Sequence, residues 1–176
     1  MSRERAQHIL KELNKRQEEN RLNYYQPYAF QERFHKAGVD ANQRLLMAAN
    51  RVGKSYVGAM EMAAHLTGLY PKWWKGKRFD KPIRAWVCGA SNETTRDICQ
   101  KELFGQPDNP RDKGKGSIPK HLIGETTRKP GVPNAHTSVL VKHSTGGWSR
   151  VAFKAYEQGA EKFMGESLDL IWLDEE

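Results

Sequence analysis

Hydrophobic residues recur at helical spacing in the first part of the chain and gather into short runs further along it. Within residues 3–22 the apolar side chains fall on one face of a helix, and six basic and four acidic residues surround them. This pattern predicts an amphipathic N-terminal helix within residues 1–23. A chain of 176 residues has room for one sizeable core, which we expect over residues 24–176.

The short apolar runs predict the strands of an α/β domain. The run RLLMAAN, residues 44–50, is followed by a tight loop and by a helical pattern that ends before Pro71. Further strands are expected at residues 83–90, 136–143, 149–156 and 168–173, the last of them buried, with a helix over residues 91–104. Residues 105–135 are rich in Gly, Pro and charged side chains, which predicts an irregular basic insertion.

The charge of the chain narrows the classes of partner. There are 29 Lys and Arg against 21 Asp and Glu, a formal net charge of +8, and residues 157–176 alone hold seven of the acidic residues. A basic body of this kind favours a polyanionic partner, above all nucleic acid. For the basic segments 71–84 and 111–129 two interpretations are open, contact with DNA phosphates and an ordinary solvated surface. No run approaches the roughly 20 apolar residues that cross a bilayer, which argues against a membrane protein.

Residues 48–55 have the sequence AANRVGKS, which matches the phosphate-loop pattern GxxxxGK[ST] except that Ala48 replaces the first Gly. A position between an apolar run and a helix suits such a loop, because its N–H groups and the helix dipole then face phosphate oxygens. We expect Lys54 to meet the β and γ phosphates and the Ser55 hydroxyl to bind Mg²⁺. The residues expected to bind ATP here are Ala49, Asn50, Arg51, Val52, Gly53, Lys54 and Ser55.

The closing run LDLIWLDEE places two carboxylates at the end of the last expected strand. We expect Asp174 to hold the metal and Glu175 to act as the general base for the attacking water. The alternative is an acidic strand end that faces solvent. In the presence of the phosphate-loop pattern, the catalytic interpretation is favoured.

Two further residues are candidates for the same site. The guanidinium of Arg51 could reach the γ-phosphate in the transition state, or could stiffen the loop through bonds to neighbouring carbonyls. Gln31 follows Tyr28 by three residues, and its amide could both donate to and accept from adenine. The histidines and cysteines have no metal-ligand spacing, so we expect no transition metal, and we expect His136 and His143 to flank a strand.

These motifs occur together with the stretch GGWSRVAFKAYEQGAEKFMGESLD, residues 146–169. Over roughly residues 24–176 the chain resembles the ATPase half of the large terminase subunits of tailed bacteriophages, the motors that pump DNA into capsids. The resemblance implies a RecA-like P-loop sheet flanked by helices and a Mg²⁺-dependent ATPase with ATP and Mg²⁺ as cofactors. It also implies that Arg51 contributes to hydrolysis, that Gln31 reads adenine, and that Asp174 and Glu175 bind Mg²⁺ and activate water.

Members of that family continue past the point where this chain stops, with a further strand and an RNase H-like nuclease domain. The resemblance therefore implies a sheet truncated after the Walker B strand, and no nuclease activity is expected from this chain. It implies double-stranded DNA, the small terminase subunit and the portal protein as partners, and a homo-oligomeric ring during packaging. The expected location is the cytoplasm of an infected bacterial host, without membrane association.

Two other functions compete with the motor interpretation. A helicase-type DNA-dependent ATPase shares both phosphate motifs, and the FKAYEQG block favours the terminase over it. A nucleotide-dependent assembly module would bind ATP and turn it over poorly. Glu175 argues against that module, because binding alone needs no residue that orients water.

Overall fold

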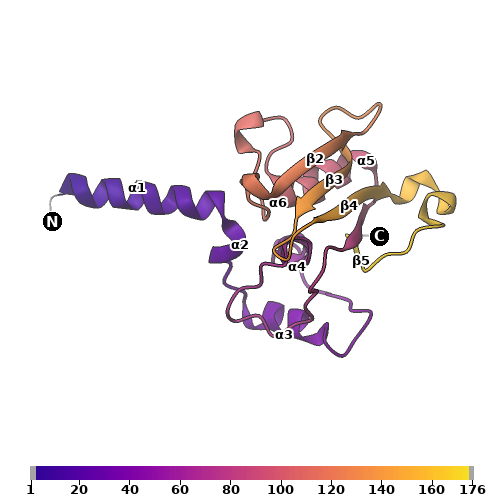
Figure 1. Ribbon diagram of the computed structural model, residues 1–176, viewed down its shortest axis with the longest axis horizontal. Coiled ribbons are helices and arrows are strands. Elements are labelled where there is room, and N and C mark those ends of the chain that lie inside the picture. Colours follow the sequence, from indigo (N-terminus) through magenta and orange to yellow (C-terminus); the bar gives the residue numbers. More distant parts are fainter. Residues whose placement is uncertain (1–2, 175–176) are drawn as a thin grey trace.

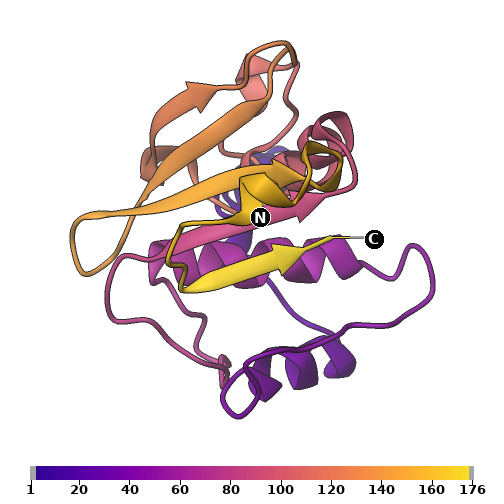
Figure 2. The ribbon, with the colours of Figure 1, turned by 90° about the vertical axis from the view of Figure 1, so that its right-hand side faces the viewer.

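The structure is a computed structural model that describes residues 3–174. Its centre is a mixed sheet of five strands in the order β2-β3-β4-β1-β5. β1 pairs in parallel with β4 and β5, whereas β3 pairs antiparallel with β2 and β4. β5 therefore forms one edge of the sheet (Figure 2). The strands span Arg84–Gly89 (β1), Ile123–Arg128 (β2), His136–Lys142 (β3), Trp148–Ala155 (β4) and Leu170–Leu173 (β5).

The first helices lie outside the sheet (Figure 1). α1 (Arg3–Glu19) buries none of its residues and projects away from the body of the molecule. The helix expected over residues 3–22 is interrupted at Asn20. The Asn20 side chain accepts a hydrogen bond from the N–H of Asn23, so this residue is the N-cap of a separate helix, α2 (Arg21–Tyr24). No helix within residues 3–174 is long and apolar enough to cross a membrane.

The remaining helices surround the sheet. α3 spans Ala29–Ala37 and α4 spans Lys54–Thr67. α5 (Asn92–Thr94), a π-helical stretch (Thr95–Gln100) and α6 (Lys101–Phe104) follow one another without a break. Short 3-10 helices span Pro110–Asp112, Lys120–Leu122, Tyr156–Gln158 and Ala160–Phe163.

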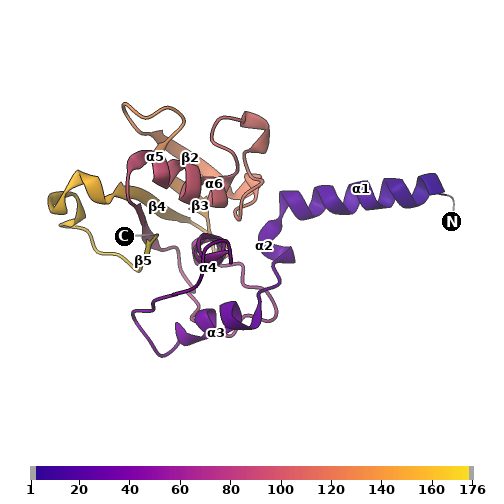
Figure 3. The same cartoon turned by 180° about the vertical axis from the view of Figure 1, so that it is seen from behind.

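The main core lies on one face of the sheet, where α4 and α6 pack side by side (Figure 3). Met60 and Leu66 of α4 and Leu103 of α6 pack there with Val87 of β1 and Phe153 of β4. On the opposite face a smaller cluster around Trp86 is covered from the segment 156–168. α4 lies between the sheet and α3 (Figures 1 and 2). The structure thus confirms the prediction of an α/β sheet flanked by helices.

The prediction of a strand at residues 44–50 is wrong. This stretch forms no strand, and Leu45 and Met47 are 81% and 82% exposed. The reason lies at Arg44, whose guanidinium donates to the backbone carbonyl of Phe34 at 2.8 Å and to the carboxylate of Glu61 at 3.2 Å. These contacts hold the start of the segment against α3 and α4, so it does not run alongside β5.

Two other parts of the sheet differ from the sequence expectation. β5 was expected to be buried, but Ile171 and Leu173 are 49% and 59% exposed. β5 pairs with β1 on one side only, as far as the described residues show. β2 lies within residues 105–135, the stretch expected to be irregular, and Ile118 in the same stretch is fully buried. Much of that stretch is therefore packed structure.

α4 approaches β5 closely at Gly58. A Cβ at this position would lie 2.5 Å from the indole of Trp172 on β5, much closer than van der Waals contact allows. Only glycine therefore lets the helix and the strand pack at this distance. The packing brings the first turn of α4 towards the end of β5.

Candidate nucleotide-binding site

The loop before α4 has an unusual backbone conformation. Gly53 is the N-cap of α4 and has φ +85°, a left-handed conformation that glycine adopts without strain. Arg51 is also left-handed, with φ +65°, which is uncommon for a residue with a side chain. α4 then continues for 14 residues. The N–H groups of its first turn have no partner within the helix, so this end of α4 is suited to an anion.

Ser55 and Asp174 meet at this end of α4. The Ser55 hydroxyl donates to Oδ2 of Asp174 at 3.2 Å, which joins the first turn of α4 to the end of β5. Asp174 is 9% exposed, and its N–H donates to the carbonyl of Cys88 at the end of β1 at 2.8 Å. The structure thus brings together the two residues predicted to hold the metal.

The donor chemistry of this pair fits Mg²⁺. Hydroxyl and carboxylate oxygens are ligands that Mg²⁺ prefers, and the ion usually takes only one or two carboxylates from a protein and completes its shell with water and phosphate. Within residues 3–174 no cluster of three or more His, Cys, Asp or Glu side chains could hold a metal. Ser55 and Asp174 supply one hydroxyl and one carboxylate, a donor set that suits a Mg²⁺ ion bound together with phosphate and water.

A buried thiol lies beside the same carboxylate. Burial raises the pKa of Cys99, and the charge and hydrogen bonding of Asp174 raise it further. Cys99 is 1% exposed. The thiol therefore stays neutral and adds no negative charge next to Asp174.

Lys54 makes its contacts within its own loop. Its Nζ donates to the backbone carbonyls of Ala48 at 2.9 Å and of Ala49 at 3.2 Å. A phosphate that binds Lys54 would exchange these neutral acceptors for a charged one, which adds the attraction of an ion pair to the hydrogen bond. The loop therefore holds the lysine in reach of an anion.

A cleft of about 1150 Å³ opens between the N-terminal helices and this loop. Arg51, Val52 and Gly53 line it from the loop, and Tyr28 and Gln31 line it from the start of α3. The amide nitrogen of Gln31 lies 3.6 Å from the position that a Cβ on Gly53 would occupy. Gln31 and part of the predicted phosphate loop thus share one cleft, whereas Lys54, Ser55 and Asp174 are not among the residues that line it.

The other predicted residues have simpler surroundings. Ala49, Asn50 and Arg51 are exposed. The Arg51 side chain lines the cleft, and both interpretations of its role, in hydrolysis and in stiffening the loop, stay predictions. Glu175 lies outside the described residues, and its assignment as general base stays a prediction. His136 begins β3 and His143 directly follows it, as expected.

Sequence reasoning missed a buried charged cluster around Glu61 of α4. The Glu61 carboxylate accepts hydrogen bonds from His35 at 2.8 Å, from Arg44 at 3.2 Å and from His65 at 3.4 Å. Burial alone would raise the pKa of Glu61, but these donors outweigh it and hold the pKa well below its ordinary value. Only the i, i+4 spacing of Glu61 and His65 was visible in the sequence, because the other two donors lie on α3 and in the following segment.

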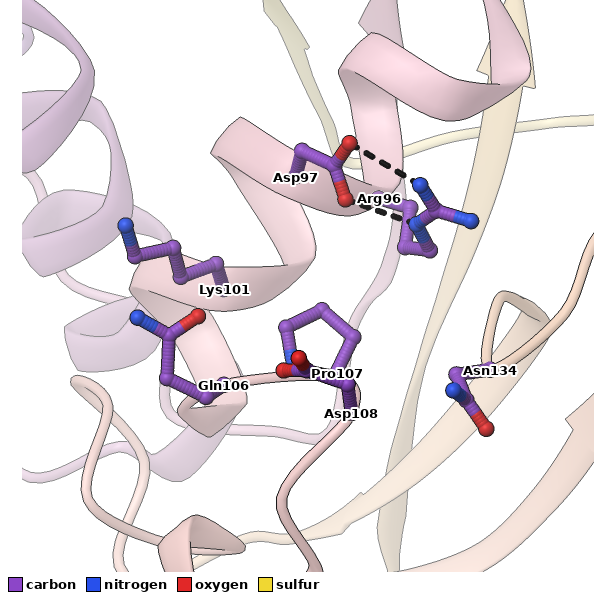
Figure 4. Close-up of a pocket in the computed structure, with 7 residues that line it drawn as sticks. All are labelled: Arg96, Asp97, Lys101, Gln106, Pro107, Asp108 and Asn134. Atoms are coloured by element: carbon purple, nitrogen blue, oxygen red, sulfur yellow. Dashed lines mark hydrogen bonds and ion pairs between the residues drawn. The ribbon is translucent and has the colours of Figure 1, made fainter.

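A second hollow, of about 320 Å³, lies beside the π-helical stretch and the turn at residues 106–108 (Figure 4). Arg96 and Asp97 form two hydrogen bonds there, of 2.7 and 2.9 Å, and so satisfy each other's charge. None of the residues that line this hollow was predicted to bind a ligand. The cleft beside the loop before α4 is therefore the better candidate.

Comparison with known proteins agrees with the motifs. Residues 45–176 match the family described as terminase large subunit, T4likevirus-type, N-terminal, and the chain therefore belongs to the terminase large subunit family. The resemblance seen in the sequence is confirmed.

Among individual proteins, the chain is 40% identical over 169 residues to the terminase large subunit of Salmonella phage P22. The match covers 86% of this chain and 34% of that relative, so the chain spans about a third of the relative's length. No solved structure matches the chain.

Proposed function

We propose that this chain is the ATP-hydrolysing motor module of a viral terminase large subunit, built on a RecA-like P-loop sheet. The observation that carries the proposal is the contact between Ser55 and Asp174, because it joins a helix N-terminus to the carboxyl end of a parallel strand. In open α/β sheets, phosphate ligands bind at this junction. Membership of the terminase large subunit family supports a role in DNA packaging.

ATP and Mg²⁺ are the proposed ligands of the cleft and of the adjoining N-terminal end of α4. Lys54 and the N–H groups around Gly53 would bind the phosphates, and Ser55 and Asp174 would hold the metal. Bound Mg²⁺ neutralises charge on the phosphates. We assign Arg51 to the charge that develops on the γ-phosphate and Glu175 to the proton of the attacking water. Gln31 would contact the base from the start of α3.

The proposed work of the module is translocation of double-stranded DNA into a procapsid. Resemblance to the family suggests the small terminase subunit and the portal protein as further partners, and a homo-oligomeric ring as the packaging assembly. The infected bacterial cytoplasm is the proposed location. The net charge of +8 supports a polyanionic partner.

Replacing the loop lysine tests the proposal directly. Lys54→Ala removes the positive charge that would face the β and γ phosphates and leaves the buried side of α4 untouched, so affinity for ATP with Mg²⁺ should fall by at least about tenfold. Calorimetric titration measures this loss. Lys72→Ala, at an exposed position of the segment 71–84, is the matched control and should bind as the wild type does. Unchanged affinity in folded Lys54→Ala would overturn the assignment of the loop.

A second variant separates binding from hydrolysis. Glu175→Gln keeps the shape of the side chain but cannot accept a proton from water, so ATP should still bind while steady-state hydrolysis is lost. A phosphate-release assay beside the calorimetric titration measures both. Hydrolysis at the wild-type rate would place the base elsewhere, and Glu176→Gln is then the next variant to measure.

A further inference from the structure

The face of the sheet opposite the main core carries an exposed tryptophan. Val141 of β3 and Val151 of β4 belong to the main core. Side chains alternate between the two faces of a strand, so Lys142 and Trp148, which are paired in the β3–β4 ladder, lie on the opposite face. The small cluster around Trp86 covers another part of this face. Trp148 itself is 50% exposed.

The indole of Trp148 is held on the sheet by a glycine two strands away. A Cβ on Gly124 of β2 would lie 2.4 Å from the six-membered ring of the indole, so a side chain at this position would displace the ring. A glycine inside a strand commonly marks a place where another group approaches the backbone closely. The indole thus reaches from β4 across β3 to β2 and is fixed there, while half of its surface stays open to solvent.

Cations flank the indole on the neighbouring strands. Lys142 stands opposite Trp148 on β3 and is exposed. Arg150 is two residues further along β4, on the same face, and lies opposite the exposed Arg84 of β1. Glu166 pairs with Arg150 at 3.2 Å, but the arginine side chain is 47% exposed, and a pair of this kind contributes little. A phosphate can therefore replace this carboxylate.

The basic segment 71–84 continues the same surface. Arg84 is its last residue and begins β1. A Cβ on Gly147, in the turn before β4, would lie 3.1 Å from the Pro82 side chain, so this turn packs against the segment. Lys81 pairs with Asp169 at 3.6 Å and keeps 66% of its side chain exposed. Positive charge thus continues from the face of the sheet into the segment.

We infer that Trp148 and the cations beside it form a binding surface for single-stranded DNA. An exposed aromatic ring gives an unpaired base a face on which to stack, and Lys and Arg beside it bind the phosphates; proteins that hold single strands without sequence preference combine these two features. A protein partner is less suited, because charged residues are depleted from the centres of protein interfaces, whereas Lys142 and Arg150 stand next to this indole.

The inference goes beyond the proposed function, whose DNA partner is double-stranded. In a duplex the bases are stacked on one another, so their faces are not accessible to the indole. The surface therefore suits an unpaired end or a separated strand. Binding of this kind needs neither ATP nor hydrolysis.

Fluorescence titration of the whole chain with oligodeoxythymidylate tests the inference. Among the five Trp residues of the chain, Trp148 is the most exposed. A base stacked on it should quench its emission, and Trp148→Phe should lose this quenching but keep most of the affinity. Trp148→Leu still covers Gly124 but offers no aromatic face, so it should bind about tenfold more weakly than Trp148→Phe. Urea unfolding of both variants confirms that they are folded.

A pair of lysine variants separates local contacts from net charge. Lys142→Gln should weaken binding of the single strand and reduce the dependence of affinity on salt. Lys11→Gln makes the same change in net charge on α1, which buries none of its residues and projects away from the body of the molecule (Figure 1). This control should bind as the wild type does. Equal losses in both variants would overturn the assignment of the cations to this surface.

Three further results would overturn the inference. Equal affinity of folded Trp148→Leu and Trp148→Phe would show that no base stacks on the indole. Equal quenching by a hairpin duplex and by the single strand would show that unpaired bases are not what the surface binds. If the wild type does not bind the single strand at all, the face is left to a protein partner. None of these results bears on the site of the ATP and Mg²⁺ titrations, so the proposed function is tested separately.

Discussion

Glu61 carries a negative charge in the interior of the molecule, where a charge is stable only if its hydrogen-bonding capacity is satisfied. His35, His65 and Arg44 supply the donors, and they come from α3, from α4 itself and from the segment that leads to the loop. One carboxylate thus ties α3, α4 and the segment before the loop to one another. Its main contribution should therefore be seen in stability.

The stability of the protein should depend on pH through this carboxyl. Because the pKa of Glu61 is held below its ordinary value of 4.5, the unfolded chain takes up the proton first as the pH falls. The stabilisation is complete above pH 4.5 and is lost as the pH falls towards the folded pKa. Glu61→Gln should lower the free energy of unfolding by about 3 kcal/mol at neutral pH, with a smaller difference from wild type in acid.

Urea unfolding of both proteins between neutral and acidic pH measures this difference. Glu32→Gln is the control, because Glu32 is 41% exposed and pairs with Lys75 at 3.4 Å. An exposed pair contributes at most about 1 kcal/mol, so this variant should stay close to wild type. A Glu61→Gln effect of the same size at every pH would contradict the assignment.

At the scale of elements, the contact between α4 and β5 sets the geometry of the site. Gly58→Ala should gain up to about 1 kcal/mol of helix propensity. The added methyl would stand 2.5 Å from the Trp172 indole, however, and overpacking of this kind costs about 1–3 kcal/mol. We expect a net loss of stability in urea unfolding, together with weaker ATP binding, because Ser55 would move away from Asp174.

A second-site change makes this prediction specific. Trp172→Leu removes the ring that the new methyl meets, so adding Gly58→Ala to Trp172→Leu should cost less than adding it to wild type. The same cost in both backgrounds would show that the indole is not the obstacle.

The sequence predicted the elements whose signals are local. α4 spans Lys54–Thr67 between the caps Gly53 and Gly68, and its apolar residues recur at helical spacing, so the helix and its start were predicted. Its end was expected later, before Pro71, because the left-handed cap at Gly68 was not recognised in the sequence. The segment 44–50 was mispredicted because an apolar run does not reveal whether a partner strand is available. β2, with the sequence IGETTR, has few apolar residues, and its pairing with β3 was not visible in the pattern.

The candidate site was predictable to a similar extent. The motifs gave Ser55 and Asp174, which the structure brings into contact across 119 residues of chain. The buried polar contacts that run from Gln31 through Tyr25 and His35 to Glu61 were not predictable, because these residues are held by tertiary packing and have no common spacing.

The basic excess of the whole molecule lies in residues 1–156, which hold 28 basic and 14 acidic side chains. No groove-reading motif is recognisable in the sequence, so DNA should be bound through its phosphates, with an affinity that falls steeply as salt rises. Filter binding across a salt series gives the number of phosphates engaged. Affinity that does not change with salt would contradict the prediction.

Charge reversal distinguishes the two basic segments. Lys77→Glu lies in the segment 71–84 and Lys120→Glu in the segment 111–129, and both positions are exposed. The variant in the segment that contacts DNA should bind more weakly and show a shallower dependence on salt. The other variant then serves as the control for the change in net charge.

The open side of β5 has a practical consequence for the behaviour of the protein in solution. Ile171 and Leu173 present apolar surface on this strand, and Leu45 and Met47 present more on the segment before the loop. An exposed apolar edge strand is a template on which another chain can add a strand, and native proteins commonly protect such edges with charge. The described part of β5 has the sequence LIWL and carries no charged side chain. Concentrated samples should therefore aggregate from this edge, and Ile171→Lys should raise the solubility limit.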